Sequence, residues 1–218
     1  MMRAGVVLFV VVYTVTAQAA TKAHAVALGK WGAISLPAAE GQGKNAIVKM
    51  RPLYVDGRAK EFTVGDVHDV TEHTFVVQRV YKLNDSLPQE SGPPQWRWQL
   101  GGWLLVDRVS GKIRAIALPD YDPDSSRVSW FRDYAAYCGI SDDGQKVLAI
   151  IVQLGHRKPL LRKAIAEGND SSLPYAAPRW ERQPVRATFD TKTDQRLAFA
   201  VKSRAVEAIP DDDDSGSE

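Results

Sequence analysis

The stretch YAAYCGISDDGQKVLAIIVQL, residues 134–154, decides the class of fold. Both of its ends are rich in apolar, β-branched and aromatic residues, and Asp-Asp-Gly at 142–144 separates them with residue types that favour a tight turn. The run 147–152 is apolar without a break, which is typical of a strand covered on both faces. The stretch therefore predicts a hairpin whose second strand is fully buried.

Similar strand signals recur along the chain. Asp56-Gly57 is the strongest short-range signal for a hairpin, and residues 84–94 combine the proline, glycine and polar residues of a loop. Alternating apolar residues in 185–201 are typical of half-buried strands. The further predicted strands lie at 52–64, 74–83, 103–118 and 185–201. These signals predict an all-β fold of antiparallel hairpins in sequence order, arranged as a sandwich or as open twisted sheets.

One segment, PLLRKAIAEG at 159–168, carries the competing signal of a short helix. Pro159 stands at a permitted first helical position and Gly168 at a typical stop. Its apolar side chains fall on one helical face: Leu160, Leu161, Ala164 and Ile165. Leu161 and Ile165 also keep the even spacing of a strand. We expect at most one short helix in the chain, near residues 159–167.

The first 20 residues have the pattern of a secretory signal peptide. Arg3 precedes an apolar run over 4–15, and Ala17-Gln18-Ala19 is a small-residue cleavage site. The apolar run of about 12 residues is shorter than the roughly 20 that a helix needs to cross a bilayer. We therefore expect cleavage, a secreted or periplasmic location, and no membrane attachment of the mature protein. An uncleaved membrane anchor is the alternative.

After the signal peptide we expect a single β-rich domain over 21–210 and a disordered acidic tail, DDDDSGSE, over 211–218. The body is mildly basic: without Arg3 and the five tail acids, the 28 basic and 26 acidic residues leave a charge of +6. Such a charge permits contact with anionic surfaces but does not require it. Cys138 is the only cysteine, so no internal disulfide forms and the fold depends on its core.

Two segments resemble blades of β-propellers of the WD40 or TolB-like type. LLVDRVSGKIRAIAL at 104–118 is similar to the strand–D-x-x-x-G–strand half of such a repeat. ISDDGQKVLAII at 140–151 is similar to the turn that begins the next blade. The resemblance covers about residues 103–154 and implies a β-meander, but no activity. Propellers need at least four blades of about 40 residues, and no third copy of either motif occurs, so we expect no closed propeller in one chain.

Three tryptophans lie in QWRWQLGGWLLVD, residues 95–107. In a strand, Trp96 and Trp98 share a face, where they would either stack on a sugar or fill the core. Gly101-Gly102 predicts a bulge that resets the inward face before Trp103. Because burial of tryptophan contributes strongly to stability, we expect Trp98 and Trp103 in the core. We expect Trp96 to be partly exposed, which makes it the candidate ligand-binding residue.

Three carboxylates, Asp120, Asp122 and Asp124, alternate in PDYDPDSS at 119–126. Calcium loops begin with such alternation because Ca²⁺ prefers several hard oxygen ligands, so these aspartates are the candidate metal ligands and Ca²⁺ the candidate cofactor. Ser125 and Phe131 stand where an EF-hand requires Gly and Glu, which excludes that motif. A simple Asp/Pro/Ser turn is the favoured alternative.

Two further groups suggest chemistry only weakly. The segment GDVHDVTEH at 65–73 gathers His68 and His73 with acids, but their spacing fits neither a helix nor a strand face, so a polar loop is favoured over zinc. Cys138 with His156 as its base would form a nucleophilic pair, yet the neighbours of Cys138 indicate a strand interior. No hydrolase elbow, phosphate loop or dinucleotide motif occurs in the sequence.

The sequence thus predicts an exported, soluble β protein that acts as a non-catalytic binding or structural module, with a polysaccharide or protein partner. The basic segment 156–163 lacks the interleaved aromatics of a nucleic-acid surface, so no nucleic acid is expected. The alternative is a secreted hydrolase with scattered acid–base residues or a metal-dependent site, using the Asp120–Asp124 loop or the His68–His73 cluster.

The signal-peptide interpretation generates a prediction about the mature N-terminus. Because the small-residue site ends at Ala19, protein from the native host should begin at Ala20 or Thr21. N-terminal sequencing or intact mass measures this directly. A retained Met1 together with tight membrane association would contradict the prediction.

Overall fold

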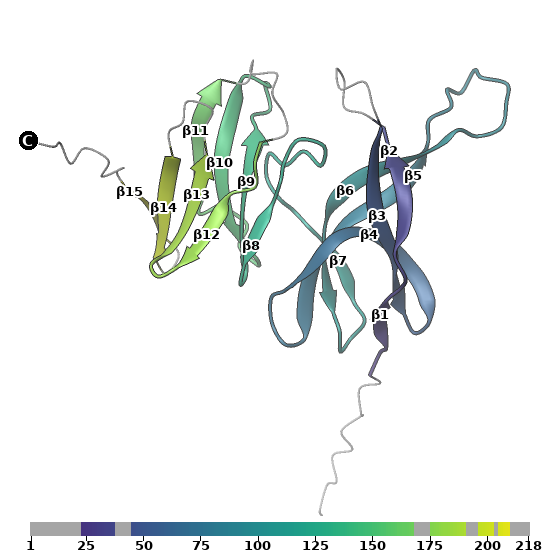
Figure 1. Cartoon of the computed structure of the whole chain (residues 1–218), viewed down its shortest axis with the longest axis horizontal. Coiled ribbons are helices and arrows are strands. Elements are labelled where there is room, and N and C mark those ends of the chain that lie inside the picture. The colour runs from purple at the N-terminus through teal and green to yellow at the C-terminus, as the bar shows by residue number, and fades with distance from the viewer. Residues whose placement is uncertain (1–22, 38–44, 168–174, 191–195, 203–204, 210–218) are drawn as a thin grey trace, which may run out of the picture.

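The chain folds into strands and their connections in every part that the structure, a computed structural model, describes: residues 23–37, 45–167, 175–190, 196–202 and 205–209. The strands form three antiparallel sheets (Figure 1). The expected signal peptide and acidic tail lie outside the described residues. Within the described ranges, no helix is long and apolar enough to cross a membrane.

The N-terminal sheet has seven strands in the order β1-β3-β4-β5-β6-β7, with β2 paired to β3. Its strands are β1 (Val26–Leu28), β2 (Gly32–Leu36), β3 (Ala46–Val55), β4 (Arg58–Asp69), β5 (Thr74–Asn84), β6 (Trp96–Asp107) and β7 (Ile113–Ile116). From β3 to β7, strands adjacent in sequence are adjacent in the sheet, as hairpins in sequence order require.

Two four-stranded sheets follow, and each is a meander. The middle sheet has the order β11-β10-β9-β8, and the C-terminal sheet has the order β12-β13-β14-β15. Their strands are β8 (Ser129–Phe131), β9 (Tyr134–Ile140), β10 (Lys146–Gln153), β11 (Leu161–Glu167), β12 (Arg179–Arg182), β13 (Val185–Asp190), β14 (Arg196–Lys202) and β15 (Ala205–Ile209). The all-β prediction, with its antiparallel hairpins, is confirmed.

The hairpin turns follow the sequence signals. Asp56 and Gly57 connect β3 to β4 with φ angles of 52° and 73°, the positive values that a tight two-residue turn needs. The Asp56 carboxylate also accepts a hydrogen bond from the Ala25 amide at 3.0 Å and lies 2.7 Å from His24 Nδ1. One turn therefore joins β3 to β4 and holds the start of β1 against them.

Strand β10 is the best-buried element, as its unbroken apolar run predicted. Val147, Ala149 and Ile151 pack in a cluster with Phe189 and Phe199 of the C-terminal sheet, so the two four-stranded sheets lie face to face. The alternate residues of the strand point the other way, because successive strand side chains alternate between faces. Leu148, Ile150 and Val152 pack there with Tyr137 and with residues of the 118–130 region.

The prediction of a short helix near 159–167 is wrong, because this segment forms strand β11. Its backbone pairs with β10 from Ile151↔Leu161 to Lys146↔Glu167. Leu161 and Ile165 pack against the core between the two four-stranded sheets. An isolated helix of this length is marginal in water, so the ladder with β10 and the burial of these two side chains outweigh the local helical preference.

The two faces of the N-terminal sheet bury different clusters. On one face, Val80 packs with Ile34 and Leu36 of β2, which folds over the sheet and contacts β6. On the other face, Val77 packs with residues of β1, β3, β6 and β7. Gly101 and Gly102 lie opposite the single residue Arg79, so the bulge predicted there is present.

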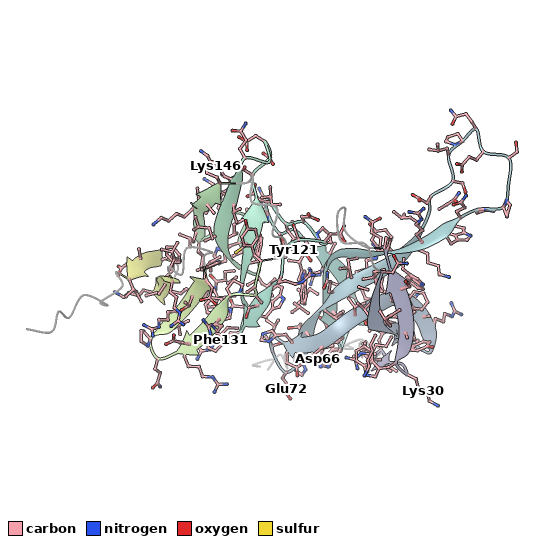
Figure 2. All side chains as sticks on the ribbon, turned by 45° about the horizontal axis from the view of Figure 1, so that its top comes forward. Lys30, Asp66, Glu72, Tyr121, Phe131 and Lys146 are labelled. Atoms are coloured by element: carbon pink, nitrogen blue, oxygen red, sulfur yellow. The ribbon has the colours of Figure 1, made fainter. Side chains whose placement is uncertain are left out.

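Two aromatic contacts of Trp130 join the N-terminal sheet to the middle sheet. The Trp130 ring stacks on His68 at 6.2 Å and meets Trp103 edge-on at 5.4 Å. His68 Nε2 lies 2.8 Å from the carbonyl oxygen of Arg132. Tyr121, which Figure 2 shows between the sheets, accepts a hydrogen bond from the Gln78 amide at 3.2 Å. Aromatic packing and hydrogen bonds together fix this junction.

Substitutions at two separate glycines, Gly139 and Gly102, test how tightly the connection between the sheets packs. A side chain at Gly139 would overlap the carbonyl oxygen of Asp120 and come within 2.7 Å of Ile150 Cδ1. We therefore expect Gly139→Ala to destabilise the fold by about 1–3 kcal/mol, the usual cost of overpacking a core. Gly102→Ala is the matched control, because a Cβ at Gly102 meets no atom within 4 Å. Urea unfolding measures both, and equal midpoints for the two variants would contradict this packing.

Candidate functional site

The three tryptophans of β6 differ in exposure. Trp96 is 60% exposed, as expected, and is the first residue of β6, directly after the β5–β6 connection. Trp98 and Trp103 are half-buried rather than fully buried. Trp98 meets Phe62 edge-on at 5.5 Å, and Lys82 Nζ lies 5.0 Å from its ring centroid. Trp98 and Trp103 are therefore committed to contacts within the protein, and Trp96 alone offers an open ring.

The three aspartates of the 119–126 segment point to different partners. Asp120 accepts two hydrogen bonds from the Arg162 guanidinium, at 2.8 and 2.9 Å. Asp122 accepts one from Ser125 Oγ at 2.7 Å and one from the Asp124 amide at 3.0 Å. Among the described residues, no group of three or more His, Cys, Asp and Glu side chains is arranged to hold a metal ion. The Ca²⁺ site therefore stays a prediction that this geometry does not support.

The charges of these aspartates follow from their partners. The Arg162 hydrogen bonds lower the pKa of Asp120, although partial burial of the carboxyl opposes them. Burial and the neighbouring Asp122 raise the pKa of Asp124, which Arg127 partly offsets. Asp120 is thus held as the anion of an ion pair, whereas the pKa of Asp124 is shifted in the opposite direction.

The nucleophile considered at Cys138 lies in the core between the two four-stranded sheets. The side chain is almost fully buried, and burial raises the pKa of its thiol to about 12. His156 is exposed in the turn between β10 and β11. A thiol in such surroundings stays protonated, so it lacks the thiolate that attacks a substrate. His68, from the other candidate cluster, is committed to the junction with Trp130.

A cavity of about 630 Å³ lies on the N-terminal sheet, and it is the best candidate site in the described structure. It forms over the face on which β2 folds across the sheet toward β6. Its lining residues come from β2 to β6, the residue before β2 and the segment before β8: Trp31, Leu36, Ala46, Val48, Lys49, Val64, Gly65, Asp66, Gln78, Leu100 and Arg127. Neither Trp96 nor any of Asp120, Asp122 and Asp124 is among them.

The floor of the cavity is the outer part of an apolar cluster. Leu36 and Val64 are buried, and Val48 and Leu100 pack against them from the neighbouring strands. A register shift in β4 between Val64 and His68 breaks the regular ladder at this point. Gly65 lies in the shift with a φ of 69°, a conformation that glycine adopts without strain. The irregular strand leaves space beside the floor and presents Asp66 to solvent.

The rim of the cavity is polar and mostly exposed. Lys49, Asp66 and Arg127 are exposed, and Gln78 is half-buried beneath them. Trp31 is 44% exposed, and the Arg51 guanidinium lies 4.1 Å from its ring centroid. An apolar floor below a few polar groups is the usual composition of a small-molecule site, and the volume lies within the roughly 300–1,000 Å³ of such sites.

Sequence reasoning did not identify this cavity. The residues that line the cavity are spread from 31 to 127 in the sequence, so no short motif brings residues from its different parts together. One local signal was available: Gly65, an isolated glycine between strand-forming residues, is the usual mark of a bulge, and bulges are frequent beside binding sites.

The chain was compared with models of protein families, with curated proteins and with solved structures, and none of them matches it. The site is therefore interpreted from its own residues.

The Asp120–Arg162 pair generates a prediction of pH dependence. Because the folded state lowers the Asp120 pKa, the pair contributes stability above the ordinary carboxyl pKa of 3.8 and loses it as the pH falls through the lower folded value. Arg162→Gln should therefore destabilise the protein at neutral pH, and its difference from wild type should narrow toward about pH 3. Urea midpoints across this range measure the effect. Arg157→Gln, at an exposed turn residue, is the control and should not change the midpoint. A pH-independent difference would contradict the prediction.

Proposed function

We propose that this chain is an exported, non-catalytic binding module that holds a small, partly apolar ligand in the cavity of the N-terminal sheet. Export rests on the signal-peptide pattern of the first 20 residues. The single observation that carries the binding role is the cavity itself, an open space above an apolar floor with separate polar groups on its rim.

The lining favours binding over hydrolysis. Among the described residues, the lining includes one carboxylate, Asp66, and no histidine, cysteine or serine that would pair with it as base or nucleophile. The hydrolase alternative would use the Asp120–Asp124 loop or the His68–His73 cluster. Within these, Asp120 is paired with Arg162 and His68 packs on Trp130. The scaffold supports a preformed site, since five strands and a hydrogen-bonded turn position the lining.

A polysaccharide or a protein remains the second class of partner, with Trp96 as its contact. Trp96 and the neighbouring Leu83 and Leu87 are exposed apolar side chains on or beside the β5–β6 connection. A stacking site at the β5–β6 connection would act independently of the cavity, because none of these three residues lines the cavity.

A neutral fluorescent dye, N-phenyl-1-naphthylamine, tests the cavity. We expect wild-type protein to bind the dye with saturable enhancement of fluorescence, because the apolar floor excludes water from the ring system. Ala46→Trp places a large ring at an exposed position of the lining on β3. Because this ring takes up space that the dye would fill, the dye should lose one good apolar contact, and its binding should weaken by about tenfold or more.

Two controls separate the cavity from other apolar surfaces. Ala164→Trp adds the same ring at an exposed position of β11, outside the cavity, and should leave dye affinity unchanged. Trp96→Ala removes the most exposed tryptophan of β6 and should also leave it unchanged. The proposal fails if wild-type protein does not bind the dye, or if Ala46→Trp binds it as tightly as wild type.

A further inference from the structure

Building on the proposed function, we propose that the cavity takes an amphipathic anion: an apolar chain or ring that carries a carboxylate or a similar anionic oxygen group. The apolar part lies on the floor of Leu36, Val48, Val64 and Leu100, and Lys49 and Arg127 bind the anionic group.

The floor requires an apolar partner. Leu36 and Val64 are only 7% and 6% exposed, so the floor is a continuation of the hydrophobic core. Val48 and Leu100 remain half-buried beside them. A ligand that covers the exposed parts of Val48 and Leu100 removes them from water, which favours binding, whereas Leu36 and Val64 are already buried and contribute little more.

Two rim cations, Lys49 and Arg127, are exposed and can bind an anionic group, although the charge of Arg127 also acts on the Asp124 carboxyl. Neither cation forms an ion pair with another residue of the described ranges. Arg127 makes one long hydrogen bond, 3.4 Å, to the carbonyl oxygen of Asp124. By contrast, Arg79 is paired with Glu61 at 2.8 Å, and Arg108, which follows β6, is paired with Asp69 at 2.6 Å.

The charge around the rim is predominantly positive. Arg51 lies two residues from Lys49 on β3 and places its guanidinium 4.1 Å from the ring centroid of Trp31, which lines the cavity. Residues two apart on a strand share a face, so Arg51 and Lys49 lie on the face of β3 opposite to Val48, and of the two only Lys49 belongs to the lining. Asp66 is the one carboxylate of the described lining. The lining thus holds two cations, Lys49 and Arg127, against one carboxylate, and this excess favours an anionic ligand over a cationic one.

The hydrogen-bonded turn before β8 fixes the backbone position of Arg127. The Ser126 amide donates to the Asp122 carbonyl oxygen at 2.8 Å, and Ser126 Oγ accepts from the Asp122 amide at 3.2 Å. Ser125 and Ser126 are buried at 6% and 3% exposure. The aspartate segment thus has a positioning role: it holds the backbone from which Arg127 reaches the cavity.

Displacement of N-phenyl-1-naphthylamine by three ten-carbon amphiphiles tests the inference. Decanoate, 1-decanol and decyltrimethylammonium share one apolar chain and differ in the charge of the head group. We expect decanoate to displace the dye at about tenfold lower concentration than either of the others, because charge-assisted hydrogen bonds to Lys49 and Arg127 add to the apolar contact. In the double variant Lys49→Gln/Arg127→Gln, decanoate should lose its advantage and displace the dye at the same concentration as 1-decanol does in that variant.

The matched control is Lys82→Gln, because Lys82 lies on the same sheet over Trp98 and outside the cavity lining. This variant should keep the preference for decanoate. Equal displacement by all three amphiphiles, or a preference for decyltrimethylammonium that Asp66→Asn removes, overturns the inference and leaves the proposed function intact. No dye binding, together with no heat of decanoate binding by calorimetry, overturns both.

Discussion

Burial of β10 on both faces is the constraint on which the rest of the structure depends. A strand with apolar side chains on each side needs two covering layers. The C-terminal sheet supplies one layer through Phe189 and Phe199. The 118–130 region supplies the other, and its aromatic side chains then lie against the N-terminal sheet. Burial of both faces of β10 therefore brings all three sheets together.

The same connection couples the cavity to the rest of the fold. Arg127 follows a hydrogen-bonded turn and precedes Trp130, whose ring is held between His68 and Trp103. The rim of the cavity is thus built partly by a segment whose position is set by packing elsewhere. Burial raises the pKa of Tyr121 to about 12, with Trp103 partly offsetting it, so this phenol stays neutral and its bond from Gln78 is retained across the physiological range.

Local signals predicted the hairpins, because the residues at the turns determine them: Asp56-Gly57 adopts its turn without reference to distant residues. The unbroken apolar run 147–152 predicted burial on both faces, but not which segments cover it. The segment around Leu161 was predicted as a helix because its pairing with β10 is a tertiary contact that no local pattern encodes. The cavity was missed for the same reason. It exists only once β2 folds over the sheet toward β6, which places Leu36 beside Leu100.

Cys138 has a consequence for the kinetics of the fold. It is the only cysteine of the chain, and it lies between the middle and C-terminal sheets with a thiol whose pKa burial raises to about 12. An alkylating reagent needs both access and a thiolate, so the native sandwich protects this sulfur on two grounds. Labelling then proceeds through opening of the sandwich, and its rate reports the free energy of that local opening. The chain thus carries its own probe of how often the two sheets separate.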